Sequence, residues 1–232
     1  MTTVILLRHG RTTANTGGVL AGWTPGVQLD ETGAAQVAAV GERLAKVPLA
    51  AVISSPLERC VQTAGVVAAG RDVDVRTDDR LGEARYGDWT GQTIKELVKD
   101  PLWKIVQQHP SAAVFPGPEG EGLAQTQARA VAAVRSWNAE LGPEAVWLAC
   151  SHGDVIKAIL ADALGLHLDQ FQRIVVDPAS ISVVTYTDTR PFVVRVNDTG
   201  GDVSALIPPP RRRRRTKASS DAVVGGGAGT TV

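Results

Sequence analysis

The chain has 232 residues, which is enough for one α/β domain with a substantial core or for at most two small domains. Apolar residues make up 44% and charged residues 21%, as in an ordinary globular protein. Lysine plus arginine equals aspartate plus glutamate, 24 against 24, so the net charge gives no general attraction to nucleic acid or to a membrane surface.

The predicted elements alternate between strands and helices, because short apolar runs alternate with apolar residues at helical spacing. In chain order they are strand 4–7, helix 32–47, strand 50–54, helix 57–69, strand 73–76, helices 94–108 and 122–141, strand 145–150, helix 155–164, and strands 181–186 and 192–196. Pro101 is expected to interrupt helix 94–108. The alternation predicts a three-layer α/β/α sandwich with a mostly parallel central sheet. Two possibilities stay open for 192–196: an antiparallel edge strand, or pairing with a second subunit in a homo-oligomer.

The last 25 residues differ in composition from the rest. Residues 208–232 contain three prolines, then the five arginines 211–215, then Ser-, Gly- and Ala-rich sequence. This tail is predicted to be disordered, and the compact domain to span 1–207 with an acidic balance. A solvated tail is favoured over one that binds nucleic acid, acidic lipid or an acidic partner, because no aromatic residue accompanies the arginines. Nucleic-acid binding is therefore not expected, although the arginine run leaves it open.

A cytoplasmic location is expected, because no basic segment typical of a signal peptide precedes the first apolar stretch. No apolar run approaches the length of a membrane span, so no membrane association is expected. Cys60 and Cys150 each lie in an apolar pattern and are expected to be buried thiols, with a disulfide between them left open.

Three predicted strand ends carry unusual polar clusters. The first strand ends in Arg8, His9 and Gly10, the second in two serines with Arg59 one helical turn later, and the strand 145–150 in Ser151-His152-Gly153. Ligands of open parallel sheets bind at the carboxyl ends of the strands. Two arginines and two histidines in one crevice suit a phosphoryl group. Guanidinium groups bind its oxygens, a protonated histidine adds charge, and an imidazole nitrogen is a competent nucleophile toward phosphorus.

Four segments, in order along the chain, resemble the motifs of the histidine phosphatase superfamily, which includes the phosphoglycerate mutases. They are residues 7–12 (LRHGRT), 55–64 (SPLERCVQTA), 81–91 (LGEARYGDWTG) and 151–153 (SHG). A fifth segment, 118–122 (PEGEG), matches only loosely. The resemblance covers about residues 3–196. One Arg-His-Gly triplet is weak support, whereas four motifs in family order are strong support.

The resemblance implies a role for each matching residue. His9 is the expected nucleophile, and Glu83 is the expected proton donor to the leaving group. Arg8, Arg59 and His152 are expected to form the phosphate pocket, with Asn15 contributing a donor. Asn15 alternatively serves as a turn or cap residue. A carboxyl that donates a proton needs a raised pKa or an acidic working pH, so an optimum below neutrality is expected.

Other residues near these motifs are assigned no catalytic role. His109 and His167 are expected in loops. Trp23 and Trp89 flank the expected site and are interpreted as core residues rather than pocket residues, while 115–118 is expected to border the pocket mouth.

The predicted function is metal-independent hydrolysis of a small phosphomonoester, without a cofactor, through a phosphohistidine at His9. No paired metal-ligand motif occurs in the sequence, and the arginines supply the positive charge that a metal supplies elsewhere. A phosphoglycerate mutase-type transfer is the first alternative. It is less favoured because the long lid insertion of the cofactor-dependent mutases is not recognisable. A non-catalytic phosphate-binding module is the second, and the joint presence of His9 and Glu83 argues against it.

Overall fold

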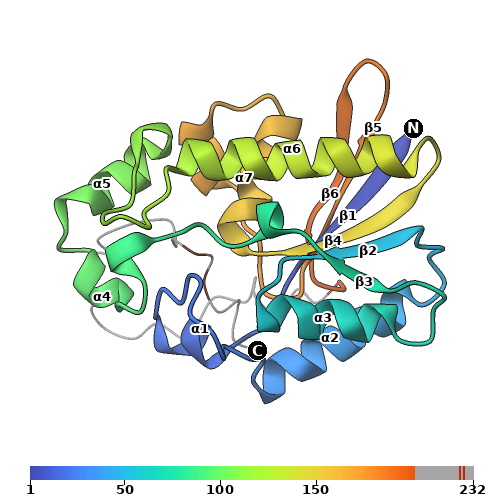
Figure 1. Cartoon of the computed structure of the whole chain (residues 1–232), viewed down its shortest axis with the longest axis horizontal. Helices are drawn as coiled ribbons and strands as arrows, with labels where there is room; N and C mark the ends of the chain where they lie inside the picture. Colours follow the sequence, from blue (N-terminus) through green and yellow to red (C-terminus); the bar gives the residue numbers. More distant parts are fainter. Residues whose placement is uncertain (202–224, 226, 228–232) are drawn as a thin grey trace.

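The computed structural model describes residues 1–201 together with Gly225 and Gly227 (Figure 1). In this part of the chain a six-stranded sheet has the order β3-β2-β4-β1-β5-β6. The strands are β1 (Thr2–Arg8), β2 (Ala51–Ser54), β3 (Val75–Thr77), β4 (Val146–Ser151), β5 (Ile181–Tyr186) and β6 (Pro191–Asp198). Strands β1 to β4 run parallel, and β5 and β6 are antiparallel additions at one edge. The predicted three-layer, mostly parallel fold is confirmed, and β6 is an antiparallel edge strand, while its pairing with a second subunit stays a prediction.

Helices cover both faces of the sheet because its central strands are apolar on both sides. Val4 and Leu6 of β1 pack in one core cluster with α6 (Leu123–Leu141) and α7 (Gly153–Ala163). Ile5 and Leu7 pack in the other cluster, with α2 (Glu31–Leu44) and α3 (Glu58–Ala68). Figure 1 shows these two helix pairs on opposite sides of the sheet.

The remaining helices are short. They are α1 (Thr13–Gly17), α4 (Ile94–Leu97), α5 (Pro101–Gln108) and the 3-10 turns η1 (Asp79–Leu81), η2 (Gly87–Trp89), η3 (Pro110–Ala112) and η4 (Leu168–Arg173). Pro101 is the first residue of α5, after the N-cap Asp100, so the predicted interruption is confirmed. Helix α1 was not predicted, because five residues are too few to show a helical period.

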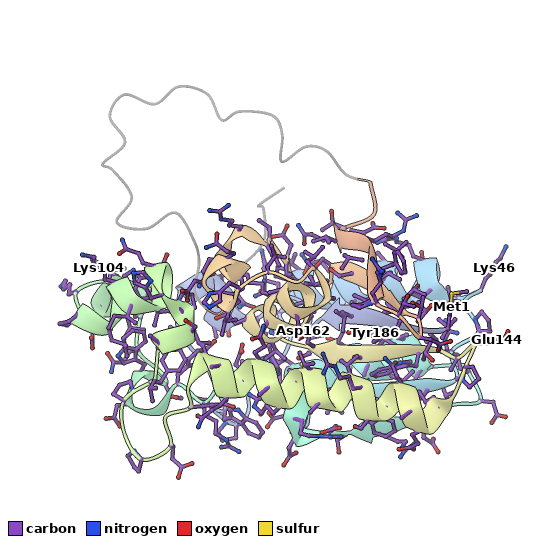
Figure 2. All side chains as sticks on the ribbon, turned by 90° about the horizontal axis from the view of Figure 1, so that it is seen from above. Met1, Lys46, Lys104, Glu144, Asp162 and Tyr186 are labelled. Carbon is purple, nitrogen blue, oxygen red and sulfur yellow. The ribbon has the colours of Figure 1, made fainter. Side chains whose placement is uncertain are left out.

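The two ends of the molecule differ in what they carry. Met1 and Glu144 lie together at one end, where the Glu144 N–H donates to the Met1 carbonyl oxygen at 2.6 Å, and Lys46 lies toward the same end (Figure 2). Lys104 of α5 marks the opposite end. Because β1 starts at Met1's end, the parallel strands point their carboxyl ends toward α1, α4 and α5.

The structure tests the prediction about the two cysteines but not the prediction about the C-terminal tail. Cys60 and Cys150 are buried free thiols, as expected. The predicted boundary at residue 207 and the predicted disordered tail 208–232 lie outside the described residues, apart from Gly225 and Gly227. Within the part of the chain that the structure describes, no helix combines the length and apolarity that crossing a bilayer requires.

The chain leaving β1 crosses the first turn of α2 at very short range. A Cβ on Gly33 would lie 2.0 Å from the Arg11 carbonyl oxygen, and a Cβ on Gly10 would lie 2.7 Å from the Gly33 oxygen. Glycine is therefore required at both positions by backbone contact. This crossing fixes the path of the residues that follow His9.

We predict that Gly33→Ala lowers the free energy of unfolding by about 1–3 kcal/mol, because the added methyl forces two backbone segments apart. Gly65→Ala on α3 is the matched control. Its Cβ meets nothing within 4 Å, so it should stabilise the protein by about 0.5–1 kcal/mol through helix propensity. Urea denaturation measures both values. Equal effects of the two substitutions would contradict the proposed backbone contact.

Candidate active site

The sequence-predicted strand ends meet at one edge of the sheet. Strands β2, β4 and β1 are neighbours, and their register pairs Ser54 with Cys150 and Arg8 with Ser151. The residues that follow each strand, including His9 and His152, are therefore brought side by side. The rings of these two histidines lie edge to face with their centroids 5.2 Å apart.

His9 is fixed in one tautomer by the backbone of the next residue, Gly10. Its Nδ1 lies 2.7 Å from the Gly10 carbonyl oxygen, which only accepts hydrogen bonds, so Nδ1 carries the proton. The His9 backbone N–H donates to the Ser151 oxygen at 3.0 Å. Burial, then the charges of Arg59 and Arg8, hold the His9 pKa well below its usual range. The ring is thus neutral near pH 7, with its lone pair on Nε2.

Two buried guanidinium groups supply the positive charge of the site. Arg8 is fully buried and donates to the Val176 carbonyl oxygen at 2.8 Å, and burial lowers its pKa to about 10, so it stays charged at neutral pH. Arg59 is 3% exposed and donates from Nη2 to the Gly22 carbonyl oxygen at 2.9 Å. Its Nη1 is buried and has no hydrogen-bond partner among the described residues. A buried donor left in this way marks a position for an anion oxygen.

His152 is the N-cap residue of α7 and is fully buried. Its Nε2 lies 2.8 Å from Ser55 Oγ, and its Nδ1 lies 3.3 Å from Arg59 Nη2. Burial and the nearby positive charges hold its pKa well below the usual range. In the free pocket a buried imidazole beside two guanidinium groups is most stable uncharged, so the expectation of a protonated histidine stays a prediction for the pocket with a bound dianion.

Glu83 lies on a loop without regular structure, held by hydrogen bonds to backbone oxygens. The Trp23 indole N–H donates to the Glu83 carbonyl oxygen at 2.6 Å. Arg129 donates to the oxygens of residues 80, 82 and 83, and Ser151 Oγ donates to the Leu81 oxygen. Arg129 is itself held by two hydrogen bonds to Glu121. These partners were not found from the sequence, since no local pattern links them to the loop.

Burial raises the pKa of Glu83 to about 7, and the negative charge of Asp154 adds to the rise. Asp154 is buried on α7 and accepts from Lys157 Nζ at 3.3 Å. The same two carboxyl groups, with burial as the main cause, hold the Tyr86 pKa well above its usual range. Glu83 lies 3.8 Å from His152 Nδ1, but because His152 is neutral this contact is not an ion pair near pH 7.

One pocket collects these groups. His9, Asn15, Arg59 and Glu83 line it, together with Tyr86 and the apolar side chains of Val19, Leu20 and Ile94. Arg8 and His152 lie behind this lining and contact it. The Asn15 Oδ1 accepts from the backbone N–H and the hydroxyl of Thr12 in a capping box, so the interpretation of Asn15 as a cap residue is confirmed. Asn15 also lines the pocket, where its role as a donor stays a prediction.

Gly225 and Gly227 also line the pocket. The Gly225 N–H donates to Asp154 Oδ2 at 2.7 Å, and its carbonyl oxygen lies 3.5 Å from Arg8 Nη2. A ligand that reaches Arg8 therefore meets this backbone.

All six predicted site residues lie in one cluster, and His109, His167 and Trp89 lie outside it. The expectation that Trp23 is a core residue is wrong, because Trp23 is only half-buried and its indole N–H donates to the Glu83 backbone beside the site. His109 and His167 have side chains 68% and 69% exposed. Trp89 packs in the core against Trp103. The expectation that 115–118 borders the pocket is wrong, because Phe115 is buried against Tyr86 and Trp89 and none of 115–118 lines the pocket. Within the described part of the chain, no three His, Cys, Asp or Glu side chains are grouped so as to hold a metal ion.

Comparison with known proteins agrees with this arrangement. The model of the histidine phosphatase superfamily (branch 1) matches residues 4–199. The chain belongs to this superfamily, and the predicted enzyme class, a phosphoric monoester hydrolase of the histidine phosphatase type, is confirmed.

Individual relatives carry several activities in their names. The chain is 32% identical to a probable phosphoglycerate mutase, GpmB, of Proteus mirabilis, over 89% of this chain and 95% of the relative. It is 28% identical to phosphoserine phosphatase 1 of Hydrogenobacter thermophilus, over 86% and 93%. Among solved structures, YhfR of Bacillus stearothermophilus superposes with a TM-score of 0.79 and 29% identity, over 85% of this chain and 98% of that one.

The raised pKa of Glu83 predicts a pH-dependent cost in stability. Folding raises this pKa from an ordinary 4.5 to about 7, so the folded protein binds more protons than the unfolded chain between those values. The stability that the protonated Glu83 carboxyl provides is fully present below pH 4.5 and is lost as the pH rises through 7. The loss in the free energy of unfolding is on the order of 3 kcal/mol.

We therefore expect Glu83→Gln to gain stability relative to the native protein at pH 8.5 but much less at pH 4.5, by thermal and urea unfolding. Glu42→Gln, at an exposed position on α2, is the control and should show no such difference. A Glu83→Gln difference that is the same at both pH values would contradict the raised pKa.

Proposed function

We propose that this protein hydrolyses a phosphomonoester without a metal ion, through a phosphohistidine on Nε2 of His9. The observation that carries this proposal is the hydrogen bond from His9 Nδ1 to the Gly10 oxygen, which leaves the Nε2 lone pair available in a pocket lined by Arg59 and Glu83. A neutral imidazole with a fixed tautomer is an activated nucleophile that needs no separate base.

Arg8, Arg59, His152 and Asn15 are the proposed ligands of the phosphoryl oxygens. The guanidinium charges neutralise the dianion and the charge of the transition state. Arg59 Nη1, buried without a partner among the described residues, donates to one oxygen. The Asn15 amide NH₂ is available because its Oδ1 is engaged by Thr12.

Glu83 is the proposed acid and then the base. In the first step His9 Nε2 attacks phosphorus, the bond from phosphorus to the ester oxygen breaks, and Glu83 gives its proton to that oxygen. In the second step Glu83 takes a proton from water, the water oxygen attacks phosphorus, and the N–P bond breaks. The products are the alcohol and orthophosphate, and both residues return to their starting states.

The pocket composition favours hydrolysis over transfer to a sugar acid. Among the described residues that line it, Arg59 is the one cationic side chain, and the wall beyond the phosphate ligands is apolar, with Val19, Leu20 and Ile94. A bound phosphoglycerate needs further cations for its carboxylate. The name of the Proteus mirabilis relative nevertheless makes mutase activity the second candidate.

The remaining expectations belong to this proposal. The substrate is a small phosphorylated molecule, no cofactor or metal takes part, and the site acts in the cytoplasm, where the two buried thiols stay reduced. Pairing of β6 with a second subunit and nucleic-acid binding through 211–215 stay untested.

The first experiment is hydrolysis of p-nitrophenyl phosphate from pH 4 to 8 with a chelator present. We expect activity that His9→Ala reduces by at least ~10³-fold, as for the loss of a covalent nucleophile. His109→Ala, at an exposed histidine, is the matched control and should retain activity. Activity that survives in His9→Ala would overturn the mechanism. If the native protein is inactive, interconversion of 2- and 3-phosphoglycerate tests the mutase alternative.

The pH profile of kcat/KM should be a bell limited by His9 on its acid side and by Glu83 on its basic side, with the latter near pH 7. Asp154→Asn removes a negative charge that raises the Glu83 pKa, so the basic limb should move to lower pH. Asp162→Asn, also on α7 and paired with the exposed Arg135, is the control. A basic limb that stays in place or moves upward in Asp154→Asn would exclude this electrostatic coupling.

A further inference from the structure

The orientation of His152 separates its two ring nitrogens. Nδ1 faces the pocket, since it lies 3.3 Å from Arg59 Nη2 and 3.8 Å from Glu83 Oε2, and both of those side chains line the pocket. Nε2 faces the protein interior, toward Ser55 and Cys60, which are both fully buried. For His152 to donate to a phosphoryl oxygen, the proton of the neutral ring must be on Nδ1.

The hydrogen bonds of Ser55 determine where that proton lies. Its Oγ already accepts from the Leu57 N–H at 3.3 Å, and it lies 2.8 Å from His152 Nε2. Among the described residues the hydroxyl has no other acceptor within hydrogen-bond distance. If Nε2 carried the proton, the buried hydroxyl would receive two N–H groups and its own proton would be left unpaired, which is costly.

Cys60 does not take the place of Ser55. Its Sγ lies 3.4 Å from His152 Nε2, but the thiol donates to the Ser151 carbonyl oxygen at 3.5 Å. A thiol is also a weak donor compared with a hydroxyl. Ser55 is thus the one strong donor that the described residues offer to Nε2.

We propose that Ser55 is a positioning residue: its hydroxyl donates to His152 Nε2 and keeps Nδ1 protonated and directed at the phosphoryl group. In the free pocket Arg59 Nη2, which can only donate, points at His152 Nδ1 at 3.3 Å, so the proposed tautomer is that of the occupied pocket. There an anion oxygen accepts from both Arg59 Nη2 and the Nδ1–H of His152 and replaces this contact. The proposal rests on the proposed function for its catalytic meaning, and its NMR test is made with phosphate bound.

The direct test is ¹⁵N NMR of histidine-labelled protein with inorganic phosphate bound. The His152 resonances are identified by their loss in His152→Gln. We expect a protonated Nδ1 and an unprotonated Nε2 in the native protein, and a mixture or the reverse in Ser55→Ala. A protonated Nε2 in the native protein would overturn the proposal. This readout requires no catalysis, so it stands or fails separately from the phosphatase activity.

Kinetics provide the second test, with a neighbouring serine as the control. Ser55→Ala should lower kcat about 10–100-fold, the range seen when the hydrogen-bond partner of a functional histidine is lost, with a smaller change in KM. Ser55→Thr keeps the hydroxyl and should restore most of kcat. Ser54→Ala removes another buried serine, which donates to the Ser55 carbonyl oxygen and does not touch His152, and should change kcat little. Equal losses in Ser54→Ala and Ser55→Ala, or no rescue by threonine, would indicate a packing role only.

Discussion

Two buried guanidinium groups impose the main electrostatic constraint on this molecule. One, of Arg8, lies at the carboxyl end of β1, and the other, of Arg59, lies in the first turn of α3. Arg8 and Arg59 are 0% and 3% exposed, and removing each charge from water costs several kcal/mol. Backbone oxygens of Val176 and Gly22 offset part of that cost. The remaining cost favours an anion in the pocket, so the burial of these two charges would contribute directly to the proposed phosphate binding.

The same burial sets the protonation states of His9 and Glu83, the proposed nucleophile and the proposed acid. A low-dielectric site disfavours charge on any side chain, so it lowers the pKa of His9 and raises that of Glu83. The nucleophile must be unprotonated and the acid protonated, and both conditions hold together in the interval between the two pKa values. No separate device is needed to keep the acid and the nucleophile in complementary states, although Asp154 widens the interval by its charge.

Much of the fold and the core of the site follow from local sequence. Apolar runs gave the six strands, Pro101 gave the break between α4 and α5, and glycine-flanked histidines marked two strand ends. The strand order did not follow, because it depends on which apolar faces pair over long distances. The neutral state of His152 did not follow either, since a pKa depends on burial and on charges that other segments bring close.

The site residues also differ in what holds them. His9 and His152 continue regular strands, so the sheet register positions them. Glu83 instead lies on an irregular loop that is tied by Trp23, Ser151 and Arg129, three residues far away in the sequence. These hydrogen bonds are accepted by backbone oxygens, which every residue has, so they cannot be predicted from the sequence of the loop itself. The proposed nucleophile is therefore positioned by regular strands, whereas the proposed proton donor is positioned by tertiary contacts. Changes in the surrounding loops should therefore shift the proposed acid more than the proposed nucleophile, and in a phosphatase the acid decides which leaving groups depart.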